Sequence, residues 1–202
     1  MRMASKFQRQ YCKALAIVHG ASELQIAGYV KNKLHLPLEI YSRDNGRTSI
    51  QIHGLKGVLD NKIFNKPKNL LNHYDNVESS RNTPMDFKVF TIMDTDDCKN
   101  DEIREQYKNG MLFEEHWMHP YIVPIYNSPS LEDVMVGCGF LDKKLSDKEK
   151  LSTYSKLFPI TSGATNFEKI KALRDRFAKC KCTNFEVFID YCLDWAEKSK
   201  VK

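Results

Sequence analysis

Long hydrophobic runs are absent from this sequence of 202 residues, and none approaches the roughly 20 apolar residues that a membrane-spanning helix needs. The basic start is followed by a short apolar run without a small-residue cleavage site, which does not predict a signal peptide. The mean hydropathy of -0.51 and the 42% of hydrophobic residues exclude disordered, collagen-like and coiled-coil classes. We therefore expect a cytoplasmic globular protein that does not associate with a membrane.

Zinc-binding spacing is also absent. The six cysteines are Cys12, Cys98, Cys138, Cys180, Cys182 and Cys192. Because no secretory signal precedes them, we expect reduced thiols rather than a disulfide framework. Cys180 and Cys182 form a C-x-C pair, but no second Cys or His pair lies at the distance that a closed zinc site needs.

Charge is unevenly distributed, although the formal net charge is only +5. Residues 1–93 carry 14 Lys and Arg against 7 Asp and Glu, residues 94–147 carry 5 against 12, and residues 148–202 carry 12 against 7. An acidic middle between basic flanks suits a metal-dependent enzyme that acts on a polyanion, because carboxylates bind the cation and basic side chains bind phosphates. Ordinary solvated surface charge is the alternative explanation.

Short apolar runs and turn residues predict alternating strands and helices over residues 14–136. The expected strands are 14–18, 38–41, 87–93 and 121–126, and Pro124 favours a sheet edge or an irregular end for the last. The expected helices are one that Ser22 caps and Pro37 ends, and others over 50–59, 130–136, 147–157, 166–179 and 184–197, the last capped by Thr183 or Asn184. Residues 61–86 are expected to form a loop or a loosely structured insertion.

This alternation favours an α/β fold over residues 1–146, with a mainly parallel sheet flanked by helices. Residues 147–202 are expected to form a C-terminal helical extension packed on it. Ligands of such sheets bind beyond the carboxyl ends of the strands. Polar clusters follow three of the predicted strands, at 19–23, 94–97 and 127–133. We therefore expect these clusters to meet and form the functional site.

Two acidic residues follow the most hydrophobic predicted strand. Asp94 and Asp96 flank Thr95, so in extended backbone their side chains point to the same side. Such a pair suits Mg²⁺, which takes one or two carboxylates and keeps water or phosphate as its other ligands. Asp97 is a further candidate ligand through water. An acidic turn without a ligand is the alternative, because Asp is a common turn former.

Three further residues are candidates by position. Glu23 follows the first strand by one helical turn, and it is either a metal ligand or general base, or a carboxylate that stabilises the helix start. His19 lies in the turn itself, as a ligand or as a hydrogen-bonded structural residue. Glu132 follows the last strand, as a residue of the substrate site or as the start of a helix.

These residues carry a family resemblance over roughly residues 12–140. The sequence A-L-A-I-V-H-G-A-S-E, ending at Glu23, resembles the first motif of TOPRIM domains, and F-T-I-M-D-T-D-D, ending at Asp97, resembles the second. I-Y-N-S-P-S-L-E-D, ending at Asp133, is similar to the Asn-Pro-x-x-Glu stretch of RloB-like members. The first motif also resembles that of OLD-family nucleases.

The resemblance implies a TOPRIM-like fold and a metal-dependent nuclease with Mg²⁺ or Mn²⁺ as cofactor and DNA or RNA as partner. It also implies a role in bacterial anti-phage defence, alone as a homodimer or with a defence partner. Glu23, Asp94 and Asp96 match the acidic residues of the motifs, and His19 replaces a Glu, a change that favours Mn²⁺. OLD-type enzymes use a Lys beyond this core, for which Lys156 is the candidate.

Basic residues after the second strand are candidates for phosphate contacts: Arg43, Arg47 and Lys56, with solvated charge as the alternative. In the last predicted helix, Phe185, Phe188, Tyr191 and Trp195 recur every three or four residues. This apolar stripe predicts core packing or a dimer contact.

Other functions stay open. A TOPRIM-like module that binds nucleic acid or a protein partner without cleaving is the main alternative, and His19 is its support. Residues 121–133 resemble the opening strand of GT-A glycosyltransferases, but the acidic motif precedes that strand here, which is the reverse of their order. Phosphatases of the haloacid dehalogenase type also have an Asp-x-Asp pair, but on their first strand, whereas two strands precede it here.

Overall fold

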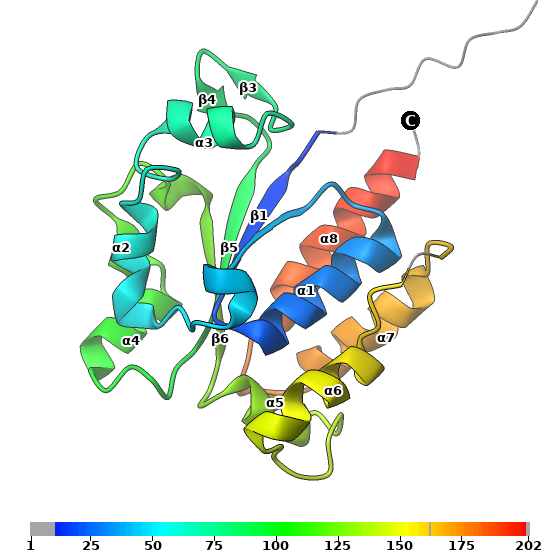
Figure 1. Ribbon diagram of the computed structural model, residues 1–202. Helices are drawn as coiled ribbons and strands as arrows, with labels where there is room; N and C mark the ends of the chain where they lie inside the picture. Colours follow the sequence, from blue (N-terminus) through cyan, green and yellow to red (C-terminus); the bar gives the residue numbers. More distant parts are fainter. Residues whose placement is uncertain (1–10, 162, 201–202) are drawn as a thin grey trace, which may run out of the picture.

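The computed structural model describes residues 11–161 and 163–200. Its centre is a sheet of four strands, β1 (Ala14–Val18), β2 (Glu39–Tyr41), β5 (Lys88–Asp94) and β6 (Ile122–Asn127). Their order is β2-β1-β5-β6 and every neighbouring pair is parallel (Figure 1). The expected α/β fold with a parallel sheet is confirmed, and β6, which contains Pro124, lies at an edge as predicted.

Helices cover both faces of the sheet (Figure 1). One layer holds α1 (Ala21–Leu34), α5 (Leu131–Gly137), α6 (Asp147–Leu157), α7 (Phe167–Ala178) and α8 (Phe185–Lys200). The other holds α2 (Leu55–Leu59), α3 (Pro67–His73) and α4 (Asp101–Lys108), with a hairpin of β3 (Ser79–Ser80) and β4 (Thr83–Pro84). Short 3₁₀ helices span Arg43–Gly46, Ile52–Gly54, Met111–Phe113 and His119–Tyr121.

Alternation along the strands divides the core between these two layers. In β1, Ala14, Ala16 and Val18 pack toward α1 and the C-terminal helices, whereas Leu15 and Ile17 pack toward the other layer. All five side chains are fully buried. Because successive side chains of a strand point to opposite faces, a strand covered on both sides is apolar throughout. This explains why the central strands are continuous apolar runs.

The three C-terminal helices lie close to the predicted ranges, and they share a core with the sheet. Phe188 and Tyr191 of α8 pack against Phe90 of β5, with ring centroids 5.2 Å apart in each pair. Phe185 and Phe188 are fully buried. The aromatic stripe of this helix therefore packs in the core.

Two local expectations were wrong, and one helix was missed. Residues 61–86 contain α3 and the β3–β4 hairpin, and Phe64 and Leu70 are buried there, so the segment is more structured than its polar composition indicates. Ser22 is not the N-cap of α1, which begins at Ala21 after Gly20. The helix α4 was not expected at all, although Asn100 caps it by accepting a hydrogen bond from the Ile103 amide.

The expectation of reduced thiols was also wrong for one pair. Cys138, at the end of α5, forms a disulfide with Cys180, between α7 and α8. The two are 42 positions apart, and they meet because α5 and α7 pack in the same layer. Cys12, Cys98, Cys182 and Cys192 are free. Among the helices of the described ranges, none is both long and apolar enough to span a membrane.

Candidate active site

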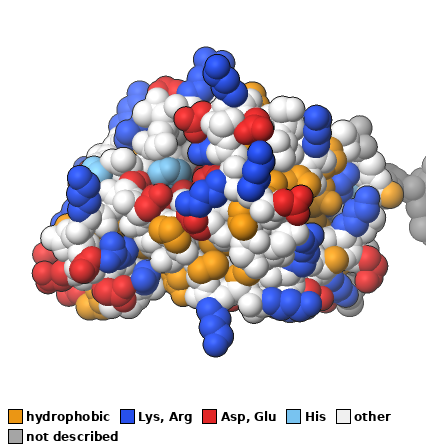
Figure 2. Space-filling model, turned by 90° about the horizontal axis from the view of Figure 1, so that it is seen from below, with side chains coloured by type: hydrophobic (Ala, Val, Ile, Leu, Met, Phe, Trp, Pro, Cys, Tyr) orange, Lys and Arg blue, Asp and Glu red, His pale blue; other side chains and the backbone are white. Residues whose placement is uncertain are grey.

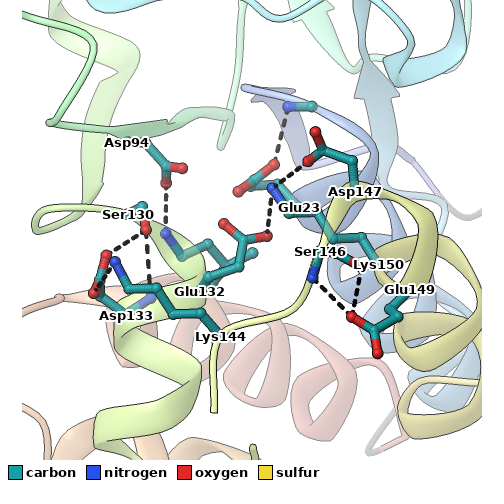
Figure 3. Close-up of polar contacts among 12 residues, drawn as sticks. Glu23, Asp94, Ser130, Glu132, Asp133, Lys144, Ser146, Asp147, Glu149 and Lys150 are labelled. Carbon is teal, nitrogen blue, oxygen red and sulfur yellow. Dashed lines mark hydrogen bonds and ion pairs between the residues drawn. The ribbon is translucent and has the colours of Figure 1, made fainter.

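The turns after β1, β5 and β6 meet at the carboxyl end of the sheet, as expected for the polar clusters. They enclose a cavity of about 370 Å³ with an acidic floor, called here the acidic cavity. The charged and imidazole side chains that line it are His19, Glu23, Arg47, Asp94, Glu132, Asp147 and Lys150. Figure 3 shows that the carboxylates of Glu23, Asp94 and Glu132 face a common space. Three residues far apart in the sequence therefore come together in one site.

Glu23 is held by the first turn of α1. Its Oε2 atom accepts a hydrogen bond from the backbone N–H of Gly20 at 2.9 Å, and the residue is 2% exposed. Burial, with the nearby Glu132 carboxylate, raises the pKa of Glu23 from 4.5 to about 7. The charged form of this side chain is thus costly in the protein without a ligand.

Asp94 is the last residue of β5 and is 6% exposed. Its Oδ1 atom accepts two hydrogen bonds of 3.0 Å, from the side-chain amide of Asn127 and from the backbone N–H of Leu131. Burial and then the like charge of Glu23 raise its pKa well above the ordinary value of 3.8. Asn127 lies opposite Asp94 in the β5–β6 register, which brings its amide into reach.

Glu132 contacts a cation from the C-terminal helices. The Nζ atom of Lys150, in α6, lies 3.4 Å from Glu132 and 3.2 Å from Asp147, and Figure 3 shows it between them. Burial opposes the charge of Lys150, but the two carboxylates outweigh burial and raise its pKa. Lys144 pairs with Asp133 at 2.6 Å nearby. Figure 2, which looks onto this end of the molecule, shows acidic and basic side chains intermixed.

A second, adjoining hollow of about 310 Å³ shares His19, Asp94, Glu132 and Lys150 with the acidic cavity. Asp96 lines it and is exposed, so Asp94 and Asp96 open onto the same region.

Asp97 lies beside His19, with 3.6 Å between its Oδ2 atom and Nδ1 of the imidazole. The same Nδ1 atom lies 3.0 Å from the carbonyl oxygen of Ile50. Because a carbonyl only accepts, Nδ1 carries the proton and Nε2 is the nitrogen left for a ligand. Asp97 thus contacts the imidazole rather than lining the acidic cavity.

Of the three basic residues expected to contact phosphate, one lines the acidic cavity and two do not. Arg47 lines the acidic cavity, because the turn that contains it lies against the start of α1. At Gly46 the backbone φ is +81°, and a Cβ atom there would lie 2.8 Å from Cα of Ala21. Arg43 and Lys56 do not line the cavity, and Lys56 pairs instead with Glu115 at 3.8 Å.

Lys156 is exposed on α6 and does not line the acidic cavity, whereas Lys150 of the same helix does. Sequence reasoning missed Lys150 as a site residue, and it included Asn127 only as the start of the polar cluster at 127–133. Asn127 is the last residue of β6, and a polar residue at the end of an apolar strand is a usable signal. No local pattern marks Lys150, which reaches the site only through the packing of α6 on α1.

The residues present can be compared with the needs of a divalent ion. Within the described ranges, no group of three or more His, Cys, Asp or Glu side chains is arranged to hold one. The donors of the acidic cavity nevertheless suit Mg²⁺, which needs only one or two carboxylates. Glu23 and Asp94 are both buried, and in the described part of the chain neither has an ion pair with Lys or Arg. A hard cation would relieve their mutual repulsion.

Comparison with protein-family models finds no match to this sequence. Comparisons with curated proteins and with solved structures find no significant similarity either.

Proposed function

We propose that this protein is a divalent-metal-dependent hydrolase of phosphodiester bonds in nucleic acid, of the TOPRIM type. The observation that carries the proposal is that Glu23 and Asp94, from different elements, face each other in one cavity while buried and, among the residues that the structure describes, without an ion pair to Lys or Arg. Like charges buried together raise each other's pKa, because keeping both groups ionised is unfavourable. A cation bound by both carboxylates would make the ionised forms favourable.

The basic side chains that line the acidic cavity are an argument for a phosphate-containing substrate. Arg47 and Lys150 line it beside the carboxylates. The guanidinium group of Arg47 can bind two phosphate oxygens in parallel, whereas the ammonium group of Lys150 acts as a compact charge. The carboxylates of the cavity could thus bind a metal ion, and the neighbouring basic side chains could bind a polyanion.

In the proposed mechanism, Glu23 and Asp94 would hold Mg²⁺ or Mn²⁺. The bound ion would supply a more acidic water molecule as the nucleophile and would offset charge on the phosphate. Arg47 and Lys150 bind the non-bridging oxygens of the phosphate and orient it. The amides of Asn127 and Leu131 keep Asp94 fixed through their hydrogen bonds to its Oδ1 atom.

The test is cleavage of labelled DNA and RNA while Mg²⁺ and Mn²⁺ are titrated. We expect cleavage that depends on metal and falls by at least about 100-fold in Asp94→Asn and in Glu23→Gln. Asp142→Asn is the matched control, because Asp142 is exposed and does not line the acidic cavity. Circular dichroism shows whether each variant is folded. Metal-dependent cleavage that persists in folded Asp94→Asn would contradict the site assignment.

A binding module without cleavage is the second candidate, and His19 favours it. This residue stands where the first TOPRIM motif has Glu, and its Nδ1 atom binds the backbone of Ile50. Binding of nucleic acid that needs no metal, together with no cleavage at any metal concentration, would support this function instead. The role in anti-phage defence has its basis in the motif resemblance.

A further inference from the structure

We propose that Thr183, in the connection between α7 and α8, is a positioning residue for Asp94 and acts through Asn127. The inference rests on the proposed function, because it gives a C-terminal residue a role in preparing Asp94 for a metal ion. Thr183 lies 56 positions from Asn127 and does not line the acidic cavity.

A chain of short contacts links Thr183 to Asp94. The Oγ1 atom of Thr183 lies 3.1 Å from Oδ1 of Asn127, and Nδ2 of Asn127 donates to Asp94 at 3.0 Å. All three residues are buried, with exposed fractions of 5%, 0% and 6%. Buried polar groups lack water as a substitute partner, so each of these contacts constrains the next.

The hydroxyl group of Thr183 contacts the oxygen end of the Asn127 amide. An amide has one accepting and one donating end, and a flipped Asn127 would turn its oxygen toward the carboxylate of Asp94. Oδ1 of Asp94 accepts from the Leu131 amide and favours the NH₂ end, and the Thr183 hydroxyl adds to this preference by donating to the oxygen end. Thr183 has a single hydroxyl proton, which it shares between Asn127 and the carbonyl oxygen of Tyr126 at 2.8 Å.

Thr183 is itself held firmly against the edge of the sheet. It forms an isolated antiparallel bridge with Asn127, and the carbonyl of Cys182 accepts from the Ser128 amide at 2.8 Å. The side chain of Asn184 accepts from the Tyr126 amide at 2.8 Å and donates to the Pro124 carbonyl at 2.9 Å. Residues 182–184 thus act as a short extra strand along β6 and fix the position of the hydroxyl.

The first test needs neither metal nor activity. Asn127 and Leu131 donate to the same oxygen of Asp94, so their side-chain and backbone amide protons are close neighbours. We expect a nuclear Overhauser effect between them in wild type and in Thr183→Ser, which keeps the hydroxyl, and a clearly weaker effect in Thr183→Val, where the oxygen end of the Asn127 amide has lost its donor. An effect of full intensity in Thr183→Val would overturn the proposal. If Thr183→Val does not fold, Thr183→Ala provides the same comparison.

The second test is Mn²⁺ affinity by calorimetry. We expect Thr183→Val to weaken binding by about tenfold, as for other partners of metal ligands, and Thr183→Ser to leave it unchanged. In an Asn127→Ala background, Thr183→Val should have no further effect. An equal weakening in that background would overturn the proposal, because Thr183 would then act by another route. Wild type that binds no Mn²⁺ would refute the proposed function, while the Overhauser test would still decide the role of Thr183.

Discussion

The ammonium group of Lys150 lies 3.4 Å from the carboxylate of Glu132, so a C-terminal helix supplies a cation to the acidic end of the sheet. Lys150 is one-third exposed at its side chain, which leaves it accessible to a ligand in the acidic cavity. The position makes Lys150, rather than Lys156, the residue of α6 that would meet a phosphate.

This relationship predicts the kinetics of two matched variants. Lys150→Met should raise the KM for an oligonucleotide by about tenfold, because one charge-assisted contact to phosphate is lost. Lys156→Met should leave KM unchanged, since Lys156 is exposed on the same helix and outside the cavity. Steady-state cleavage assays measure both, and an effect of Lys156→Met larger than that of Lys150→Met would contradict the assignment.

Stability without metal should fall as pH rises. The pKa of Glu23 is raised to about 7 in the folded protein from an ordinary value of 4.5. Between these values the folded state keeps a proton that the unfolded state releases, so the free energy of unfolding decreases with pH across this window. Above it the loss is constant, at about 3 kcal/mol.

Glu23→Gln isolates this contribution, because Gln does not titrate and can still accept from the Gly20 amide. Urea unfolding in the presence of a chelator, at about pH 5 and about pH 8, measures the difference. The free energy of unfolding should fall less steeply with pH in the variant than in wild type. Identical pH dependence in the two proteins would show that Glu23 is not protonated in the folded state.

A divalent metal ion should restore the stability that the protein loses by burying ionised carboxylates. A ligand that binds only the folded state stabilises it by about 2.7 kcal/mol at 100 times its Kd. Millimolar Mg²⁺ at neutral pH should therefore raise the Tm of wild type and leave that of Asp94→Asn unchanged. Scanning calorimetry measures both, and an equal rise in the two proteins would place the metal elsewhere.

Gly46 holds the turn with Arg47 against α1. A Cβ atom at Gly46 would meet backbone atoms of Ala21 at 2.8 and 2.9 Å, and the positive φ adds strain for any other residue. Gly46→Ala should cost about 1–3 kcal/mol of stability and weaken substrate binding. Gly57→Ala is the control, since outside its own helix backbone and chain neighbours no atom of the described residues lies within 4 Å of a Cβ there. Urea unfolding compares them, and equal stability of both variants would contradict the close packing.

Much of the fold could be predicted because its signals are local. The strands are apolar runs that end in turn residues, and the burial of β1 and β5 on both faces explains their composition. The helix α4 is short and almost entirely polar, so hydrophobic periodicity does not reveal it. The helix α3 is also rich in polar residues, Lys and Asn, so hydrophobic periodicity does not predict it either.

The site residues likewise differ in whether a local sequence signal predicts them. Glu23 and Glu132 each follow a strand and Asp94 ends one, and the rule that parallel strands present their carboxyl ends together brings them to one cavity. Lys150 and Thr183 have no such marker, because their positions depend on how C-terminal segments pack on α1 and β6. The Cys138–Cys180 bond depends on the same packing and was missed for the same reason.

Glu23 and Asp94 are proposed to coordinate the same hard cation. A crystal structure with Mn²⁺ soaked in tests it most directly, because manganese is located by its anomalous scattering. The account predicts a peak within roughly 2 Å of an oxygen of each carboxylate, the distance of direct coordination. A peak bound elsewhere, or no peak between the two side chains at millimolar Mn²⁺, would contradict it.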